Sequence, residues 1–393
     1  MQQIDLSAFP AATREDWLKR VDAVLKGAGF DTLVSQNADG IEIAPLYGEA
    51  QGPRAERAAH APWTVHQRAD HPDAARANAQ ALDDLAHGAT GLTLTFKGHA
   101  SARGFGLVAK DLPRLLDGVA LHAMALRLEG GAAEASALAA MIARQPVDPG
   151  RLDVSFGLES AELAGALAAQ GFCGPFLEAD GRPWHDKGAT EAQELGAVLA
   201  AAVGYLRALG RPALGITLAA GQDMFLTLAK FRAMRLLWRR VLEASGLADE
   251  PLRIHAETSW RMMARLDPHT NILRAAAAVT GAGLGGADSI CARPFPLAQG
   301  LPDAFARRVA RNVQNVLLEE ANLWRVADPA SGSGYVEHLT QELCEKAWSV
   351  FQKIEKNGAW PEPDAQAAPG SPIIGTSAYR LDKEFPAAVE RLR

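Results

Sequence analysis

Short apolar runs alternate with alanine-rich stretches along most of this chain. The apolar runs have the length of buried strands, and the stretches between them repeat apolar residues at helical spacing. Seven or eight strands separated by helices, the second of them weak, predict an α/β fold, a parallel (β/α)8 barrel of the TIM type. We predict strands at 91–96, 105–110, 119–128, 153–158, 172–179, 213–219, 252–258 and 288–292. The main helical stretches are 76–86, 131–144, 160–169, 190–208 and 222–245.

The first fifty residues have a different pattern. Residues 13–27 predict an amphipathic helix that Thr13 caps together with Asp16 and that ends at Gly27. Two short strand-like pieces around an Asn-Ala-Asp-Gly turn follow it. A piece of this size does not fold alone, so we expect it to pack on the barrel or on a partner. The apolar face of the helix consists of Trp17, Val21, Val24 and Leu25.

Composition divides the chain into three parts. Residues 1–50 form the N-terminal arm, and the alanine- and arginine-containing stretch at 50–60 reads as a linker into the barrel, to which we assign 51–357. The stretch 358–372 is rich in Pro, Gly and Ala, which is typical of a linker. We therefore expect 358–393 to be a C-terminal linker and tail.

Bulk properties exclude several classes of protein. The chain has 393 residues, of which 48% are hydrophobic, and this supports a large core. A net charge of -6 gives no electrostatic footprint for nucleic acid. The N-terminal residues show no signal-peptide pattern, and no apolar run reaches membrane-spanning length. Three widely spaced cysteines argue against a disulfide framework or a zinc site and predict a cytoplasmic protein: Cys173, Cys291 and Cys344.

Two sequence motifs have structural explanations. Gly281, Gly283 and Gly286 match the spacing of a dinucleotide fingerprint, but they follow a helical run and precede a strand. We therefore predict a helix-to-strand turn at these glycines. Asp267 and His269 match the start of the D-x-H-x-x-G motif that ligates cobalt in some cobalamin proteins, but Ile occupies the glycine position. We interpret this segment as a structural loop.

Four segments in the second half resemble one known family. Between Arg253 and Glu337 the chain reads RIHAETSWRM, DPHTNILRA, LPDAFARRVARNVQNVLLEEA and VADPASGSGYVEHLT, in that order. These segments resemble the acyl-CoA-binding barrel of the methylmalonyl-CoA mutase family. The arm, with LKGAGFDTLVS and GIEIAPLY, is similar to that of the family's small subunits, and YRLDKE resembles the family's exit from the barrel. The resemblance implies the same eight-stranded barrel.

Positions that carry the chemistry of the family differ in this chain. Aligned on Pro-Trp-Thr at 62–64, the chain has Ala58 where catalytic members have a Tyr and Ala61 where they have an Arg. Pro183 stands where catalytic members have the His that bonds the substrate thioester, and His185 lies two residues later. The segment SFGLES replaces a Gln-Asn-Asp strand end, so no carboxylate clamp is visible.

The resemblance therefore implies a small, non-catalytic subunit of a heterodimeric methylmalonyl-CoA mutase, whose own active site is degraded. It implies that this chain binds no cofactor and that adenosylcobalamin belongs to a large catalytic partner subunit, which interconverts methylmalonyl-CoA and succinyl-CoA. Two alternatives stay open at this point. One is the acyl-CoA mutase barrel of a related isomerase that uses a separate cobalamin-binding chain, and the other is a scaffold or chaperone for a mutase-like complex.

No residue is predicted to be catalytic or to bind a metal. If the barrel still binds acyl-CoA, the candidate contacts are polar residues near strand ends, where barrels build their sites. A mid-strand histidine is more often a satisfied core residue than a catalyst. An arginine-rich helical stretch with Arg307, Arg308 and Arg311 is either a solvated face or a contact for coenzyme A phosphates. The candidate substrate contacts are Arg103, Arg182, His185, His255, Glu257 and Ser259.

Overall fold

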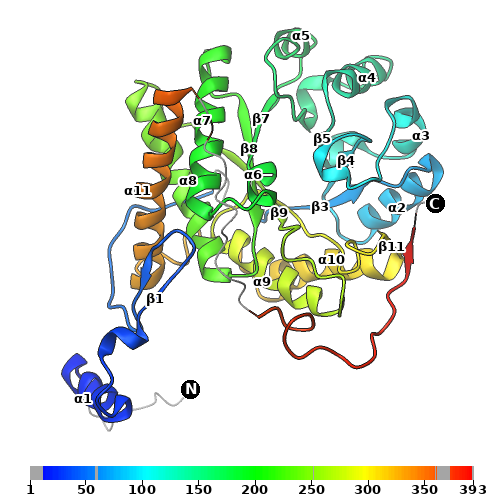
Figure 1. Cartoon of the computed structure of the whole chain (residues 1–393). Coiled ribbons are helices and arrows are strands. Elements are labelled where there is room, and N and C mark those ends of the chain that lie inside the picture. Colours follow the sequence, from blue (N-terminus) through cyan, green and yellow to red (C-terminus); the bar gives the residue numbers. More distant parts are fainter. Residues whose placement is uncertain (1–11, 58–60, 251, 359, 361–371, 392–393) are drawn as a thin grey trace, which may run out of the picture.

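The chain folds into a closed barrel of eight parallel strands (Figure 1). This is a computed structural model that describes residues 12–57, 61–250, 252–358, 360 and 372–391. Hydrogen bonds order the strands β6-β5-β4-β3-β10-β9-β8-β7. The two outer strands meet through a bridge between Leu158 and Leu177 and through the Phe156 N–H, which donates to the carbonyl of Pro175 at 3.0 Å. The predicted (β/α)8 fold is confirmed.

The strands and helices follow the expected alternation, with the helices outside the barrel. The strands are β3 Thr64–Ala69, β4 Gly91–Thr95, β5 Ala125–Glu129, β6 Asp153–Ser155, β7 Leu177–Asp180, β8 Leu214–Ala220, β9 Arg253–Thr258 and β10 Ser289–Cys291. The main helices are α2 Ala74–Ala86, α4 Ala132–Ile142, α5 Ala164–Ala169, α7 Glu191–Leu209, α8 Met224–Ala244, α9 Thr270–Leu284, α10 Ala304–Asn315 and α11 Gly334–Asn357. Shorter helices are α3 Leu112–Leu115 and α6 Arg182–Asp186.

One predicted strand is wrong, and one real strand was missed. Residues 105–110 form a loop that joins the sheet only by the Phe96–Leu107 bridge, because Gly104 and Gly106 take positive φ values of 90° and 121°. The missing strand is β3, whose sequence TVHQRA carries three long polar side chains. These polar residues hid the strand because a buried parallel strand usually reads as a continuous apolar run.

The hydrophobic core lies between the outer face of the sheet and the helices. Leu92 and Leu94 on β4 and Leu126 and Leu128 on β5 are all at most 3% exposed and belong to one continuous cluster. Their neighbours in sequence point to the opposite face, into the barrel, because side chains alternate along a strand. On β5 these inward residues are Arg127 and Glu129, so the inside of the barrel is polar.

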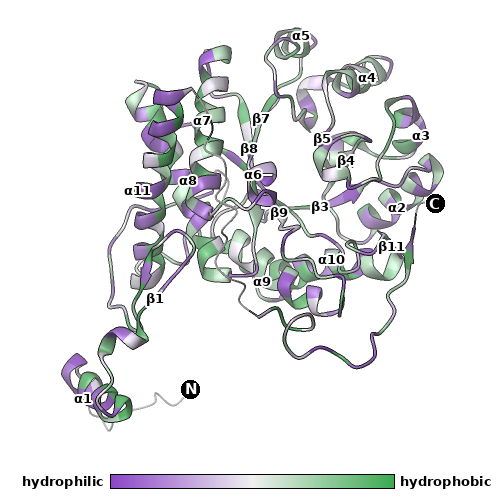
Figure 2. Cartoon of the chain, viewed as in Figure 1, coloured by the Kyte–Doolittle hydropathy of each residue, from purple (hydrophilic) through white to green (hydrophobic). Residues whose placement is uncertain are grey.

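The predicted arm helix is confirmed as α1 Arg14–Leu25. The Asp16 N–H donates to the Thr13 hydroxyl at 3.2 Å, and the Asp16 carboxylate accepts the Thr13 N–H at 3.2 Å. The helix projects away from the barrel (Figure 1), and no residue in it is buried. Its green and purple turns in Figure 2 show both hydrophobic and hydrophilic side chains. Trp17 packs edge-on against Phe30, with ring centroids 6.0 Å apart, but Val24 on the same face is 78% exposed, so the apolar face is only partly covered by the described residues.

A hairpin anchors the arm to the barrel. Strands β1 Ser35–Gln36 and β2 Glu42–Ile43 pair around the predicted turn. Ile41 is 1% exposed within the core cluster, and the Asp39 carboxylate accepts the N–H of Ala192 in the first turn of α7 at 3.1 Å. Burial raises the pKa of the Asp39 carboxyl, so this residue is held in a partly desolvated position.

We expect Asp39→Ala to lower the free energy of unfolding by about 1–2 kcal/mol, because it removes the acceptor for a helix N-terminal N–H. Amide hydrogen exchange in the hairpin should accelerate with it, since this contact holds the hairpin on α7. Asp31→Ala, at an exposed position of the same arm, is the matched control and should leave both quantities unchanged. Equal effects of the two substitutions would contradict the anchoring role.

The described part of the C-terminal segment crosses the outside of the barrel. Its strand β12 Val389–Glu390 pairs with β11 Leu301–Pro302, and Glu390 accepts from Arg76 on α2 at 2.6 Å. The predicted linker at 358–372 lies almost entirely outside the described residues. None of the helices that the structure describes is long and apolar enough to cross a membrane.

Candidate functional site at the C-terminal mouth of the barrel

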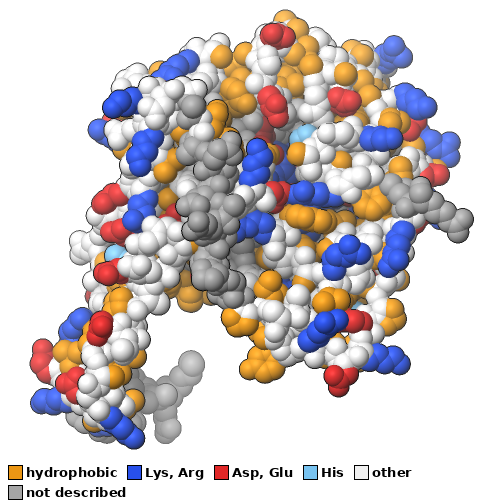
Figure 3. Space-filling view, viewed as in Figure 1, with side chains coloured by type: hydrophobic (Ala, Val, Ile, Leu, Met, Phe, Trp, Pro, Cys, Tyr) orange, Lys and Arg blue, Asp and Glu red, His pale blue; other side chains and the backbone are white. Residues whose placement is uncertain are grey.

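The inside of this barrel differs from that of most TIM barrels. Branched apolar side chains usually fill such an interior in layers. Here the buried inward positions hold charged and hydroxyl side chains, and Figure 3 shows basic and acidic side chains gathered around the hollow in the middle of the displayed face. Sequence alternation such as Leu-Arg-Leu-Glu at 126–129 already indicates a strand with one apolar and one polar face. These buried polar residues are His66, Arg68, Thr93, Thr95, Arg127, Glu129, Glu178, Thr217, His255 and Glu257.

A layer of ion pairs closes the C-terminal end of the barrel. Glu257 at its centre accepts from Arg68 at 2.8 Å, from Arg182 at 2.6 Å and from Arg293 at 2.6 Å. Glu129 is the second carboxylate, 3.4 Å from Arg68 and also paired with Arg182. All five side chains are at most 6% exposed. We call Arg68, Glu129, Arg182, Glu257 and Arg293 the ion-pair layer.

Electrostatics hold the ion-pair layer in its charged form. Burial alone would raise the pKa of Glu257, but Arg293, Arg182 and Arg68 outweigh it and lower that pKa to about 2. The pKa of Glu129 is likewise held well below its ordinary value by its arginine neighbours, against the effect of burial. Glu129 also accepts the hydroxyl protons of Thr95 at 2.8 Å and Ser101 at 2.5 Å. Asp70 and Asp180 next to the layer also pair with Arg68 and Arg182, whereas Nη1 of the buried Arg293 has no hydrogen-bond partner within the described residues.

The structure brings three of the sequence-predicted contacts to this mouth. Arg182 and Glu257 are members of the ion-pair layer. Arg103 lies on the rim, with its guanidinium 4.7 Å from the ring centroid of Trp260, and it pairs with Asp186. Sequence reasoning missed Arg68, Glu129 and Arg293, although charged residues inside buried strands were a signal that could have found them.

Two further predicted contacts, His185 and Ser259, form a separate buried network beside the layer. His185 Nε2 lies 2.7 Å from the Ser259 hydroxyl, and its Nδ1 lies 3.2 Å from the Glu194 carboxylate. Lys230 and the other contacts of Glu194 outweigh burial and lower its pKa to about 2, so it only accepts hydrogen bonds. Nδ1 of His185 therefore carries a proton that it donates to the Glu194 carboxylate.

Ser259, His185 and Glu194 are connected in the same order as the serine, histidine and carboxylate of a catalytic triad, but all three are buried. Ser259 is 3% exposed and His185 is 5% exposed. His185 and two neighbouring carboxylates, Glu191 and Glu194, also lie close enough together to hold a metal ion. The Lys230 ammonium already donates to both carboxylates, at 2.9 Å to Glu194. The Lys230 ammonium group thus occupies the position that a metal ion would take. We therefore interpret the cluster as a structural ion pair.

His255 lies apart from the other candidates. It is on β9 with Glu257, but two residues nearer the start of the strand, and its Nδ1 lies 2.7 Å from the Ser289 hydroxyl. Its ring packs edge-on against His66 with centroids 5.3 Å apart. The six predicted contacts therefore divide among the C-terminal mouth, the His185 network and the opposite end of the barrel.

The cavity next to the ion-pair layer is acidic. It has a volume of about 740 Å³ and lies over the C-terminal ends of β4 to β7. Four carboxylates and one lysine line it: Glu134, Glu159, Glu162, Asp180 and Lys97. Asp180 is paired with Arg182 at 2.7 Å, which leaves a formal charge of -2. Burial lowers the pKa of His99, which also lines the cavity, so its imidazole is neutral at pH 7. Such a lining repels a carboxylate or phosphate.

Pro183 lies at this cavity, in the short helix α6 that follows β7. Its side chain offers no donor to a substrate carbonyl. Ala61 is half-buried at the entrance to β3, and Ala58 lies outside the described residues. The SFGLES segment supplies Leu158, Glu159 and Ser160 to the cavity wall, so an acidic side chain stands in this region.

The motifs with structural explanations behave as predicted. Gly281 and Gly283 lie in the last turns of α9, and Gly286 has a φ of 96°, which makes the helix-to-strand turn. The Asp267 carboxylate accepts the Thr270 hydroxyl at the start of α9. His269 packs on the ring of Phe295, with centroids 4.9 Å apart.

A contact of coenzyme A phosphates with Arg307 or Arg311 is contradicted by the structure. Both guanidiniums are buried and pair with the carboxylate of Asp84 on α2. The pairing joins α10 to α2 and leaves no exposed fork for a phosphate. Arg308 lies over the ring of Phe305 at 5.5 Å on the outside of the molecule.

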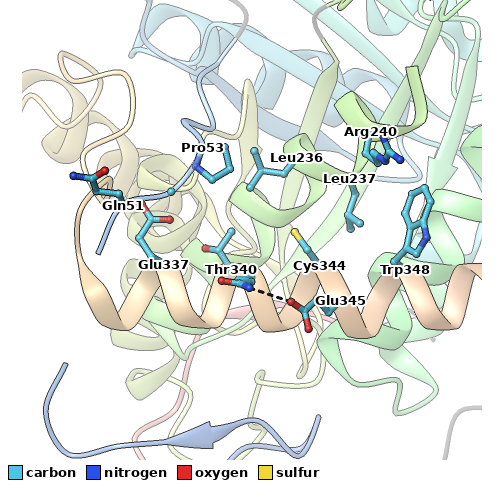
Figure 4. Close-up of a pocket in the computed structure, with 12 residues that line it drawn as sticks. Gln51, Pro53, Leu236, Leu237, Arg240, Glu337, Thr340, Cys344, Glu345 and Trp348 are labelled. Carbon is cyan, nitrogen blue, oxygen red and sulfur yellow. Dashed lines mark hydrogen bonds between the residues drawn. The ribbon is translucent and has the colours of Figure 1, made fainter. Parts of the chain in front are cut away.

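An apolar hollow of about 560 Å³ lies outside the barrel, where residues 51–53 cross α8 and α11 (Figure 4). Leu236, Leu237 and Trp348 form its apolar wall. Cys344 also lines it, and burial raises the pKa of this thiol to about 12. The thiol is therefore protonated at pH 7 and is a poor nucleophile.

Comparison with known proteins gives consistent matches. The profile of the family described as Methylmalonyl-CoA mutase matches residues 176–387. The methylmalonyl-CoA mutase small subunit of Streptomyces virginiae is 39% identical over 98% of this chain and 72% of its own length. That of Propionibacterium freudenreichii subsp. shermanii is 32% identical over 89% of this chain.

The chain is shorter than these relatives. It spans 63% of the length of the propionibacterial subunit. Among solved structures, a dihydropteroate synthase of Burkholderia cenocepacia is 18% identical, covers 70% of this chain and 99% of its own, and has a TM-score of 0.38.

Proposed function

The chain belongs to the methylmalonyl-CoA mutase family, and on that premise we propose that it is a small, non-catalytic subunit of a heterodimeric mutase. A large partner subunit would interconvert methylmalonyl-CoA and succinyl-CoA. The observation that carries this proposal is the ion-pair layer across the C-terminal end of the barrel. An acyl-CoA that entered the barrel would have to separate these buried charges, which costs several kcal/mol for each unpaired ion.

The acidic cavity supports the same proposal. Methylmalonyl-CoA carries a carboxylate and phosphates, and a lining with a formal charge of -2, counted with Arg182 beside Asp180, repels both. Pro183 offers no hydrogen bond to a thioester, and Ala61 offers neither charge nor an aromatic ring. The barrel thus keeps its packing while the described positions that would act on a substrate are inert.

We assign the family cofactor, adenosylcobalamin, to the partner subunit. When bound, this group supplies the radical chemistry of the family. The one segment of this chain with a cobalt-ligand pattern does not fit it, because the Asp267 carboxylate accepts from Thr270 and His269 packs on Phe295. A ligating histidine needs a partner that orients its ring, and Asp267 is engaged elsewhere.

We propose the exposed apolar face of α1 as part of the contact with the large subunit. An amphipathic helix that buries none of its residues in its own chain commonly buries them against another. In this division of the chain the arm, 1–50, binds the partner, 51–357 forms the barrel, and 358–393 is a linker and tail. The three cysteines are free, which fits the cytoplasmic location that we propose.

Co-purification tests the proposed partnership. The chain is given an affinity tag and is co-expressed with the large mutase subunit from the same organism. The two chains should elute together in equal molar amounts. Titration of the isolated chain with methylmalonyl-CoA should give no heat in the micromolar range. Failure to retain a mutase subunit would contradict the proposal, and micromolar acyl-CoA binding would favour a barrel that works with a separate cobalamin-binding chain.

A further inference from the structure

The opposite end of the barrel holds a polar pocket that plays no part in the proposed function. It has a volume of about 250 Å³ and opens at the N-terminal ends of the strands. We call it the N-terminal pocket, and the ion-pair layer separates it from the C-terminal mouth. Its polar lining is Thr64, His66, Arg127, Asp153, Ser155, Glu178, Arg253, His255, Asp288 and Ser289.

The carboxylates of the N-terminal pocket are already engaged. Glu178 accepts from Arg127 at 2.8 Å, and from the hydroxyls of Ser155 and Thr217. Asp153 pairs with Arg253. Asp288 accepts from Arg235 at 2.8 Å and from the N–H of Ile254 at 2.7 Å. Arg235, which pairs with Asp288 from outside the lining, brings the arginines to three, so each of the three carboxylates has an ion-pair partner.

The donors of the pocket are not all engaged. Within the described chain, Nε of Arg127 and Nε2 of His255 are buried and have no hydrogen-bond partner, although the Glu129 carboxylate lies 3.9 Å from the Arg127 Nε. Both residues are 4% exposed and line the pocket. An arginine Nε can only donate, so it requires an acceptor. Leaving such a buried donor unpaired costs about 1–3 kcal/mol.

Each of the two histidines has one hydroxyl neighbour at Nδ1, from which we infer its tautomer. His66 Nδ1 lies 3.1 Å from the Thr93 hydroxyl, and His255 Nδ1 lies 2.7 Å from the Ser289 hydroxyl. Neither hydroxyl has another hydrogen-bond partner within the described residues, so each satisfies its proton best by donating it to Nδ1. The proton of each imidazole then sits on Nε2. Burial keeps both rings neutral at pH 7, lowering the pKa of His66 to about 4 and that of His255 well below its ordinary value.

We propose that the N-terminal pocket binds a small oxyanion, a carboxylate or a phosphate, through Arg127, His255 and His66. The buried Nε–H of Arg127 and the Nε2–H of His255 are unpartnered donors, and the Nε2–H of His66, whose ring packs against His255, adds a third. Each carboxylate in the lining already has an ion-pair partner and does not compete for the ligand. The pocket volume of about 250 Å³ is large enough for a small anion the size of several water molecules, and it is too small for a large nucleotide.

Titration of the isotope-labelled full chain tests this proposal at pH 7. The nitrogen signals of His66 and His255 should show the Nε2–H tautomer without ligand. They should shift saturably with acetate and with inorganic phosphate, and the tighter of the two probes identifies the source of the oxyanion. Acetamide, the uncharged analogue of acetate, should shift them at least tenfold less. No saturable shift up to about 50 mM of either anion, or an equal response to acetamide, would overturn the proposal.

A glycine gives a matched pair of variants. A Cβ on Gly91 would lie 2.6 Å from His66 Nε2, so Gly91→Ala should displace the ring and weaken oxyanion binding at least tenfold. A Cβ on Gly204 would meet nothing within 4 Å, and Gly204→Ala should bind as the parent does. Should Gly91→Ala not fold, His255→Gln replaces it with the same expected loss. Unchanged binding in a folded pocket variant would contradict the assignment. Neither result depends on a partner subunit or on mutase turnover.

Discussion

Replacing Glu257 by alanine should lower the free energy of unfolding by about 3–5 kcal/mol, the largest loss that we expect from one substitution. The carboxylate faces Arg68, Arg182 and Arg293 at 2.6–2.8 Å, and its removal leaves three buried guanidiniums with one fewer counterion. Chemical denaturation of the isolated chain measures this directly. Glu257→Gln keeps the shape but not the charge and should lose nearly as much.

Glu243→Ala is the control for this prediction. Glu243 also pairs with an arginine, Arg240, at 2.6 Å, but its side chain is 70% exposed. Exposed pairs contribute about 0–1 kcal/mol, so the control should change stability little. Similar small losses for both substitutions would show that the layer is hydrated and that it does not close the barrel.

The same layer predicts how stability depends on pH. The folded pKa of Glu257 is lowered to about 2, so its contribution is complete above the unfolded pKa near 4.5 and is lost as the pH falls toward 2. Burial lowers the pKa of His66 to about 4, whereas the unfolded imidazole takes up a proton near 6.5. Its contribution therefore already declines as the pH falls from 6.5 toward 4. Denaturation midpoints at pH 7, 5 and 4 should fall in that order.

Val24→Asp should weaken binding to the large subunit by roughly 10- to 100-fold while leaving the isolated chain as stable as before. Val24 is 78% exposed on the apolar face of α1, so its substitution removes little packing against the described residues. A new carboxylate on a face that is buried in the complex would lose its hydration without a partner. Surface plasmon resonance with the immobilised large subunit measures the change.

Ala23→Asp introduces the same charge one residue earlier, on the polar side of α1, because successive helical residues differ by about 100°. This control should bind within about twofold of the parent. If both variants bind like the parent, the arm does not contact the large subunit, and another surface must be sought. If both weaken binding equally, the effect is one of net charge and not of the apolar face.

Periodicity predicted the barrel because the outward faces of the strands are mostly apolar, with Gln67 on β3 as an exception that bonds to the carbonyl of Arg307 on α10. It failed at β3, where Thr64, His66 and Arg68 alternate with the core side chains, and at 105–110, where two positive-φ glycines break an apolar run. The arm helix was predicted down to its capping pair, since capping is a local interaction between Thr13 and Asp16. Local signals were therefore reliable, and errors arose where the inside of the barrel is polar.

The site was predicted less completely than the fold. Pairings such as Arg68 with Glu257 join residues that are 189 positions apart, and no local pattern specifies them. The sequence did identify Arg182 and Glu257 as polar residues near strand ends, but it suggested contacts with a substrate, whereas they contact each other. His255 and Glu257 lie on the same strand but at different heights in the barrel. To predict this difference, one needs the register of the neighbouring strands.

Turnover by the isolated chain tests the central claim most directly. The purified chain, shown by mass spectrometry to be free of any large subunit, is supplied with adenosylcobalamin and methylmalonyl-CoA, and succinyl-CoA is measured. The ion-pair layer, the acidic cavity and Pro183 predict no product above the enzyme-free background, with activity appearing when the large subunit is added. Formation of succinyl-CoA by the isolated chain would contradict the claim that this barrel is non-catalytic.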